Sequence, residues 1–171
     1  MARIALIGLP GSGKSTLGSS LGAALDSPFL DMDSLLEESS GKSPRQWVES
    51  YGWEVFRSAE SIILAALDRS YVEDSDVVIG CGGGVVETAA NVEILKKWNC
   101  IWLDAEDEVL LRRTRGSDRP QHFEASEEVV LSTLRIRRSS IYCSLGGTAV
   151  DTTPMNPDDV LDSVLKQLGE R

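Results

Sequence analysis

The sequence lacks a hydrophobic run of the length that crosses a membrane. Its longest unbroken aliphatic stretch covers only residues 62–67, far short of the roughly 20 apolar residues that a transmembrane helix needs. The apolar stretch at residues 4–9 leads directly into a glycine-rich loop and has no small-residue cleavage pattern, so it does not resemble a secretory signal. We therefore expect a cytoplasmic protein with no membrane partner.

Cysteine is scarce, and basic residues are in the minority. Cys81, Cys100 and Cys143 are an odd number without CxxC spacing, which argues against a disulfide framework and against a zinc site. We expect buried or partly buried free thiols. The 17 basic residues against 27 acidic ones give a formal net charge of −10. This charge disfavours nucleic acid as a partner, because its phosphates are also negative.

Arginine, in contrast, is concentrated in one segment. Seven of the 17 basic residues lie within residues 112–138 and all seven are arginines, namely Arg112, Arg113, Arg115, Arg119, Arg135, Arg137 and Arg138. Guanidinium groups bind phosphate and carboxylate through paired hydrogen bonds. An acidic protein with one arginine-rich segment indicates a small anionic ligand.

Strand-like and helix-like patterns alternate along the chain, whose length suits one domain of residues 1–171. Short apolar runs predict five strands, at residues 3–8, 28–33, 77–80, 100–103 and 148–152. Helical patterns follow residue 16 and cover roughly residues 44–68 with a break near Gly52, 88–97, 105–114, 125–143 and 157–168. This alternation predicts an α/β fold with a parallel sheet covered on both faces.

A phosphate-binding loop follows the first predicted strand. Residues 8–15 match the pattern GxxxxGK followed by Ser or Thr, between a predicted strand and a predicted helix, as the motif requires. Glycines let backbone N–H groups turn toward phosphates, and the helix N-terminus adds partial positive charge. Lys14 would bridge the β- and γ-phosphates, and Ser15 would bind Mg²⁺. The loop residues that we expect to contact ATP are Gly11, Ser12, Gly13, Lys14, Ser15 and Thr16.

Further motifs, in matching order and spacing, resemble those of shikimate kinases over nearly the whole chain. They are residues 8–16, FLDMD at 29–33, Gly52 to Arg57 followed by Glu60, the glycines 82–84, Arg119 before Pro120, and Arg138 four residues before Tyr142. The resemblance implies a P-loop NTPase fold of the nucleoside-monophosphate-kinase type, with three α/β/α layers and a five-stranded parallel sheet. It also implies a mobile lid at approximately residues 112–125 and a substrate-binding helical region at approximately residues 33–60.

The reaction that the resemblance implies is ATP-dependent phosphorylation of the 3-hydroxyl of shikimate, in aromatic amino acid biosynthesis, with ATP and Mg²⁺ as cofactors. By resemblance, Asp31 helps to hold Mg²⁺ through water, and Asp33 accepts the reacting hydroxyl and can act as base. If the second strand continues to residue 33, strand alternation points both carboxylates to one side. The alternative is that Asp33 only caps the following helix.

The resemblance also assigns roles on the substrate side. Arg57, which can pair with Glu60 on one helix face, would clamp the shikimate carboxylate together with Arg138. The backbone of Gly82, Gly83 and Gly84 would closely approach the substrate ring. The alternatives are a surface ion pair of little energetic value for Arg57 and a loose turn for the glycines.

The predicted lid carries a further arginine. By resemblance, Arg119 would close over ATP and neutralise charge on the γ-phosphoryl oxygens while closure excludes water. Lys14, Asp33 and Arg119 are therefore the expected catalytic residues. Arg113, or its neighbour Arg112, would contact the nucleotide, although solvated arginines explain these positions equally well.

Three positions depart from the family's pattern. Trp53 stands where the family usually has Glu, and the lid continues after Pro120 with Gln121 and His122 in place of two leucines. Residues 151–157 lack an arginine that some members place against adenine. We expect His122 to lie at the surface.

Two alternative functions follow from these departures. One is a kinase of another small hydroxy acid such as gluconate, and the other is a catalytically silent nucleotide-binding regulatory module. We expect a monomer.

Overall fold

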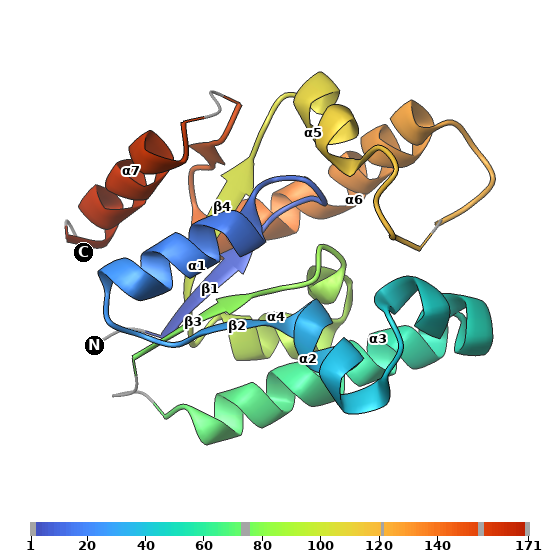
Figure 1. Ribbon diagram of the computed structural model, residues 1–171, viewed down its shortest axis with the longest axis horizontal. Coiled ribbons are helices and arrows are strands. Elements are labelled where there is room, and N and C mark those ends of the chain that lie inside the picture. The colour runs from blue at the N-terminus through green and yellow to red at the C-terminus, as the bar shows by residue number, and fades with distance from the viewer. Residues whose placement is uncertain (1–2, 73–75, 121, 154–155, 170–171) are drawn as a thin grey trace.

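A parallel sheet with the strand order β2-β3-β1-β4-β5 forms the centre of the molecule (Figure 1). The computed structural model describes residues 3–72, 76–120, 122–153 and 156–169. Its strands are β1 (Arg3–Ile7), β2 (Phe29–Asp31), β3 (Val77–Gly80), β4 (Asn99–Asp104) and β5 (Val150–Asp151). β1 pairs with both β3 and β4, so that Leu6 lies opposite Gly80 on one side and Ile101 on the other. The predicted five-stranded parallel sheet is confirmed.

Helices cover both faces of the sheet, because successive strand residues point to opposite sides. In β1, Ala5 and Ile7 belong to one buried core cluster, whereas Ile4 and Leu6 belong to the other. The second cluster packs against α1 (Lys14–Ala24) and α7 (Pro157–Gly169). The first cluster packs against α3 (Pro44–Ser70), α4 (Ala89–Leu95) and α6 (Glu127–Gly146). The expected three layers are therefore present.

The remaining short elements surround the ends of the strands. They are α2 (Met32–Ser40), the 3₁₀ turn η1 (Val85–Glu87) and α5 (Asp107–Thr114). Within α3, Gly52 has a φ of 82° and a ψ of 168°, a conformation that favours glycine, and the predicted break at this residue is confirmed. The helix starts at a capping box between Ser43 and Gln46, which satisfies backbone N–H groups of the first turn.

The second strand ends earlier than its sequence pattern predicts. Oδ1 of Asp31 accepts hydrogen bonds from the backbone N–H groups of Asp33, at 3.0 Å, and Ser34, at 3.2 Å. Asp31 is therefore the N-cap of α2, and Asp33 lies in the first helical turn. The chain is therefore not extended at residue 33, so strand alternation does not apply there, although Asp31 and Asp33 line the same cavity. The alternative that Asp33 caps the helix is wrong, because Asp31 is the cap.

One edge of the sheet gathers the predicted motifs, since parallel strands end on the same side. The phosphate loop follows β1, Asp31 ends β2, and the glycines 82–84 follow β3.

In the part of the chain that the structure describes, no helix combines the length and hydropathy of a membrane span. Cys81 and Cys100 are buried thiols outside any disulfide, as expected, but Cys143 is exposed on α6, so the prediction of burial is wrong there.

Candidate active site

The phosphate loop joins β1 to the N-terminus of α1 in a turn that requires glycine. Gly11 and Gly13 have φ angles of 83° and 92°, in the left-handed region. A Cβ atom on Gly8 would lie 2.1 Å from the carbonyl oxygen of Leu103 in β4, so the neighbouring strand leaves no room for a side chain. The loop is thus a concave turn of backbone in front of a helix N-terminus, which is a geometry that binds phosphate.

The ammonium group of Lys14 folds back onto this loop. Its Nζ donates hydrogen bonds to the carbonyl oxygens of Gly8, at 3.0 Å, and Leu9, at 2.9 Å. Burial, followed by the nearby charge of Arg119, lowers the pKa of Lys14 to about 8. Phosphate charges would favour the protonated form, so this position suits a cation that binds a polyphosphate.

Oxygen donors stand beside the lysine. The Ser15 hydroxyl donates to Oδ2 of Asp31 at 2.7 Å, and hydroxyl and carboxylate oxygens are the ligands that Mg²⁺ prefers. The donor set therefore fits a magnesium ion that also contacts nucleotide phosphates. Desolvation and then the charge of Asp31 raise the pKa of Asp33 above its ordinary value, whereas Lys14 and Arg119 oppose the shift.

A cavity of about 420 Å³ opens in front of the phosphate loop. All of the predicted loop residues except Ser12, which is buried behind the loop, line this cavity. Arg113 forms part of its wall and donates to the carbonyl oxygens of Gly11, at 3.2 Å, and Thr152, at 2.6 Å. The alternative of a merely solvated Arg113 is therefore wrong. Thr152 belongs to no sequence motif, and only its place at the end of the last predicted strand marks it.

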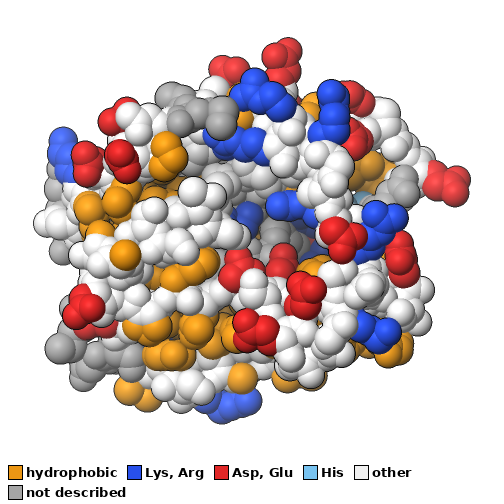
Figure 2. Space-filling model, in the orientation of Figure 1, with side chains coloured by type: hydrophobic (Ala, Val, Ile, Leu, Met, Phe, Trp, Pro, Cys, Tyr) orange, Lys and Arg blue, Asp and Glu red, His pale blue; other side chains and the backbone are white. Residues whose placement is uncertain are grey.

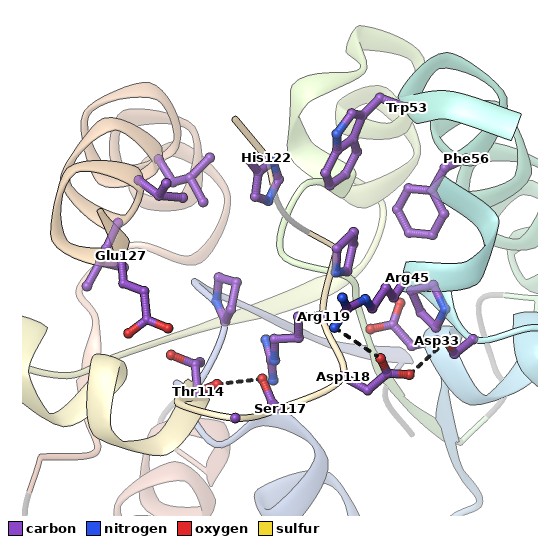
Figure 3. Close-up of a pocket in the computed structure, with 18 of the residues that line it drawn as sticks. Asp33, Arg45, Trp53, Phe56, Thr114, Ser117, Asp118, Arg119, His122 and Glu127 are labelled. Atoms are coloured by element: carbon purple, nitrogen blue, oxygen red, sulfur yellow. Dashed lines mark hydrogen bonds and ion pairs between the residues drawn. The ribbon is translucent and has the colours of Figure 1, made fainter. Parts of the chain in front are cut away.

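A second cavity has a volume of about 880 Å³, and Figure 3 shows residues that line it. Its walls come from α3, from α6 and from the α5–α6 loop, residues 115–126, in which Gln121 lies outside the described residues. Asp33 and Arg119 line both cavities, so the two spaces meet at this pair. Figure 2 shows the hollow on this face, with basic side chains inside it and acidic side chains on its rim.

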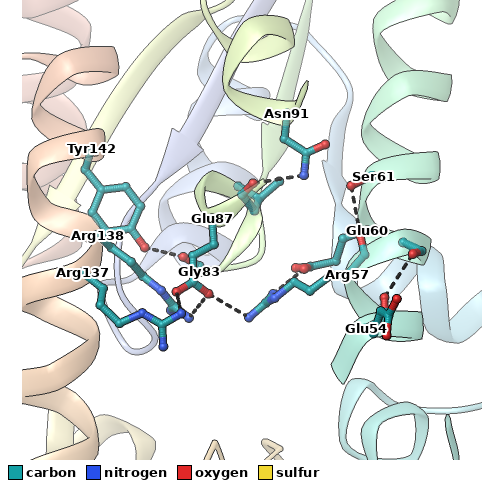
Figure 4. Close-up of polar contacts among 12 residues, drawn as sticks. Glu54, Arg57, Glu60, Ser61, Gly83, Glu87, Asn91, Arg137, Arg138 and Tyr142 are labelled. Carbon is teal, nitrogen blue, oxygen red and sulfur yellow. Dashed lines mark hydrogen bonds and ion pairs between the residues drawn. The ribbon is translucent and has the colours of Figure 1, made fainter. Parts of the chain in front are cut away.

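An ionic cluster lies between α3, η1 and α6 (Figure 4). Arg57 pairs with the buried Glu60 and lies 3.4 Å from Glu87, and Arg138 lies 3.0 Å from the same Glu87 carboxylate. The structure thus brings the two predicted carboxylate-binding arginines together around one acid. Sequence reasoning missed Glu87, because it lies in no motif, and its only signal was its position three residues after the triple glycine.

The three glycines make room for this cluster. A Cβ atom on Gly82 would lie 2.4 Å from Oε1 of Glu60, and one on Gly84 would lie 2.1 Å from Nη2 of Arg57. The Tyr142 hydroxyl donates to the carbonyl oxygen of Gly83. The alternative of a loose turn is therefore wrong, since the glycines let arginine and glutamate side chains approach the backbone closely.

Gly84→Ala tests this packing. Gly84 has a φ of −96°, so alanine brings no backbone strain, but its methyl group displaces the Arg57 guanidinium. We expect the KM for a carboxylate substrate to rise about tenfold, the equivalent of one charge-assisted hydrogen bond, with a smaller change for ATP. Gly169→Ala is the matched control, because a Cβ atom there would meet no described residue beyond its own helix backbone within 4 Å. Equal changes of both KM values in Gly84→Ala would contradict the assignment.

The α5–α6 loop contacts the N-terminal half of α3 and the Ser43 cap before it. Ser43 donates to Oδ2 of Asp118 at 2.9 Å, and the His122 ring stacks on Trp53 with 4.2 Å between centroids. The prediction that His122 lies at the surface is wrong, because the ring is half-buried against Trp53. The contact joins two of the positions at which the sequence departs from the shikimate kinase pattern. Of the predicted lid, residues 112–114 form the last turn of α5.

The His122 environment predicts an acid-sensitive contact. Burial, then the charges of Arg138 and Arg57, lower the pKa of His122 to about 4, against Glu87, which raises it. The unfolded chain takes up this proton near pH 6.5, whereas the folded protein resists it, so the free energy of unfolding falls as pH drops from 6.5 toward 4. We expect His122→Gln to lose less thermal stability between pH 7 and pH 5 than wild type.

Calorimetry at the two pH values measures this difference directly. His122 is the only histidine in the sequence, so the comparison isolates one group, and titrations common to both proteins cancel. Parallel stability curves for wild type and His122→Gln would contradict the lowered pKa.

Comparisons with known proteins agree with this geometry. The family model described as shikimate kinase matches residues 10–169. The shikimate kinase of Enterococcus faecalis is 34% identical over 174 residues, which cover 99% of this chain and 100% of that protein.

Solved structures are similar over the same length. A shikimate kinase from Acinetobacter baumannii in complex with shikimate superposes with a TM-score of 0.91 at 28% identity, covering 99% of this chain and 94% of that one. A shikimate kinase from Aquifex aeolicus gives a TM-score of 0.79 at 30% identity, covering 98% and 96%.

Proposed function

Because the chain belongs to the shikimate kinase family, we propose that it transfers the γ-phosphoryl group of ATP to the 3-hydroxyl of shikimate, giving shikimate 3-phosphate and ADP. One observation carries the proposal. The cavity at the phosphate loop and the cavity beside Arg57 meet at Asp33 and Arg119, so a donor in one and an acceptor in the other would face each other there.

The nucleotide side binds and neutralises the phosphates. The loop N–H groups and Lys14 hold the β- and γ-phosphates, and Arg113 and Thr152 form another part of the cavity wall. Ser15 and Asp31 hold Mg²⁺, which supplies positive charge to the phosphates when it is bound. Together, these residues orient the γ-phosphoryl group toward Asp33.

The substrate side orients the acceptor. Arg57 and Arg138 bind the shikimate carboxylate, and Asp33 accepts a hydrogen bond from the 3-hydroxyl. As the hydroxyl oxygen bonds to the γ-phosphorus, its proton passes to Asp33 and the bond from that phosphorus to the bridging oxygen of ADP breaks. Arg119 neutralises charge on the transferred group, and the α5–α6 loop excludes water that would otherwise accept the phosphoryl group.

The decisive experiment is ADP release from MgATP by the purified protein, with and without shikimate. We expect a strong increase with shikimate and a much weaker one with gluconate, because two arginines and Asp33 must be engaged together. A stronger response to gluconate would indicate the other kinase, and no response to either acid with intact nucleotide binding would indicate a silent binding module. Light scattering of the same preparation tests our proposal that one domain of residues 1–171 acts as a monomer.

A further inference from the structure

The two arginines that would bind the substrate carboxylate already share a carboxylate of this chain. Oε2 of Glu87 lies 3.0 Å from Nη2 of Arg138 and 3.4 Å from Nη2 of Arg57, and Oε1 lies 2.7 Å from Nη2 of Arg137 (Figure 4). A substrate carboxylate presents the same chemical group to the same donors. Two carboxylates within hydrogen-bond distance of each other repel, so both cannot occupy this position.

Glu87 is held in this position by the fold. It ends the η1 turn, which starts directly after Gly84, and the buried Asn91 side chain donates to the carbonyl oxygen of Val85 at 3.0 Å. The Glu87 side chain is only 18% exposed. A surface acid would be free to move among many orientations, whereas this one is directed into the cluster by its backbone.

The charges and the exposure of the cluster agree with this arrangement. The side chain of Arg138 is 1% exposed, and of the two arginines only Arg57 lines the substrate cavity. The buried Nε of Arg138 also finds no hydrogen-bond partner among the described residues. Arg57 and Arg138 are balanced by Glu60 and Glu87, so these four groups together offer no net charge to an anionic ligand.

A third arginine provides an alternative partner for Glu87. Arg137 is 56% exposed and contacts the other carboxylate oxygen, Oε1. A rotation of the Glu87 side chain toward Arg137 and solvent would keep that ion pair while releasing Arg57 and Arg138. The release would turn a neutral group of four into a site with one uncompensated positive charge, which matches one substrate carboxylate.

We propose that Glu87 is an internal competitor that occupies the carboxylate-binding arginines until substrate displaces it toward Arg137, and that it thereby sets the affinity and selectivity for substrate. This inference rests on the proposed function. A ligand that offers only a carboxylate has to displace the Glu87 carboxylate, which is the same chemical group, so its net binding free energy is small. Shikimate also engages Asp33 through its hydroxyl, so the free energy of its contacts exceeds the free energy lost when Glu87 leaves the arginines. Competition with Glu87 therefore selects shikimate over ligands that offer only a carboxylate.

Glu87→Gln tests the inference, because glutamine removes the negative charge at position 87 but keeps an acceptor oxygen for Arg138. We expect the KM for shikimate to fall about tenfold, the equivalent of one charge-assisted hydrogen bond, and shikimate to raise the melting temperature more than in wild type. Glu93→Gln is the matched control, because Glu93 is 69% exposed on α4. A KM for Glu87→Gln that is unchanged or raised overturns the inference, since Glu87 would then only position the arginines.

Glu87→Asp is the second variant, because it keeps the charge that balances the buried Arg138. Its shorter side chain reaches the arginines less well, so the KM should lie between those of Glu87→Gln and wild type. A KM equal to that of wild type would indicate a long-range charge effect and would overturn the inference even if Glu87→Gln does not fold.

Arg137→Ala completes a double-mutant cycle. Without its alternative partner, Glu87 stays on Arg57 and Arg138, so the KM for shikimate should rise about fivefold, the upper end of what one exposed ion pair contributes. In the Glu87→Gln background the same change should have no effect, whereas equal effects in both backgrounds overturn the inference. If wild type shows no shikimate-dependent ADP release, the proposed function itself fails, and this inference fails with it.

Discussion

Arg119→Ala should lower kcat for shikimate phosphorylation about a thousandfold, the lower end of what a transition-state arginine contributes to phosphoryl transfer. Arg119 reaches both cavities from the α5–α6 loop. Its charge acts on Lys14 and Asp33, the two residues at which we propose that the γ-phosphoryl group is transferred. Because negative charge on that group redistributes mainly during transfer, the variant should lose kcat far more than it loses ATP affinity. Steady-state ADP release at saturating ATP measures the effect.

Arg115→Ala is the matched control for this prediction. Arg115 is an exposed arginine at the start of the same loop and is absent from the lining of both cavities, so its loss should leave kcat within about twofold, a surface-charge effect. Arg119→Lys keeps the charge but loses the planar fork and should be intermediate. A similar loss of kcat in Arg115→Ala and Arg119→Ala would mean that the loop responds to net charge and that Arg119 has no specific role.

Asp33→Asn should lower kcat by about two to three orders of magnitude, within the usual range for a general base. The loose transition state asks little of a base, but the amide also loses the orientation of the reacting hydroxyl. Asparagine removes a charge that is disfavoured by desolvation and by Asp31, which raise the pKa of Asp33. The variant should therefore be at least as stable as wild type at pH 7, although it is nearly inactive.

The pH dependence separates a base from a structural residue. If Asp33 accepts the proton, as we propose, wild-type activity should fall as pH drops through the raised pKa of this carboxylate, at a higher pH than for an ordinary aspartate. The residual activity of Asp33→Asn should not show this fall at low pH. Glu38→Gln, on the exposed part of α2, is the control with the same acid-to-amide chemistry. An unstable Asp33→Asn, or one whose pH profile follows that of wild type, would argue against a base at this position.

The fold and the phosphate loop were predictable because they depend on local patterns. Apolar runs of strand length between helical patterns led to the five-stranded parallel sheet, and Gly52 marked the break in α3. The length of the second strand was not predictable, since the pattern of FLDMD suits an extended strand. The helix begins there because the Asp31 side chain caps the N–H groups of Asp33 and Ser34, and a local cap outweighs strand propensity over two residues.

The sequence by itself determined the family, the sheet and the residue types near the phosphates, because each of these depends on neighbours along the chain or on motif spacing. Only the tertiary structure decided which charges face one another. Glu87, Arg57 and Arg138 are far apart in the sequence, and no pattern predicts that one acid joins both arginines. Likewise, His122 is half-buried because the loop brings it onto Trp53. Ion pairs and ring contacts depend on distances across the fold, and therefore the departures from the family at Trp53 and His122 became interpretable only in three dimensions.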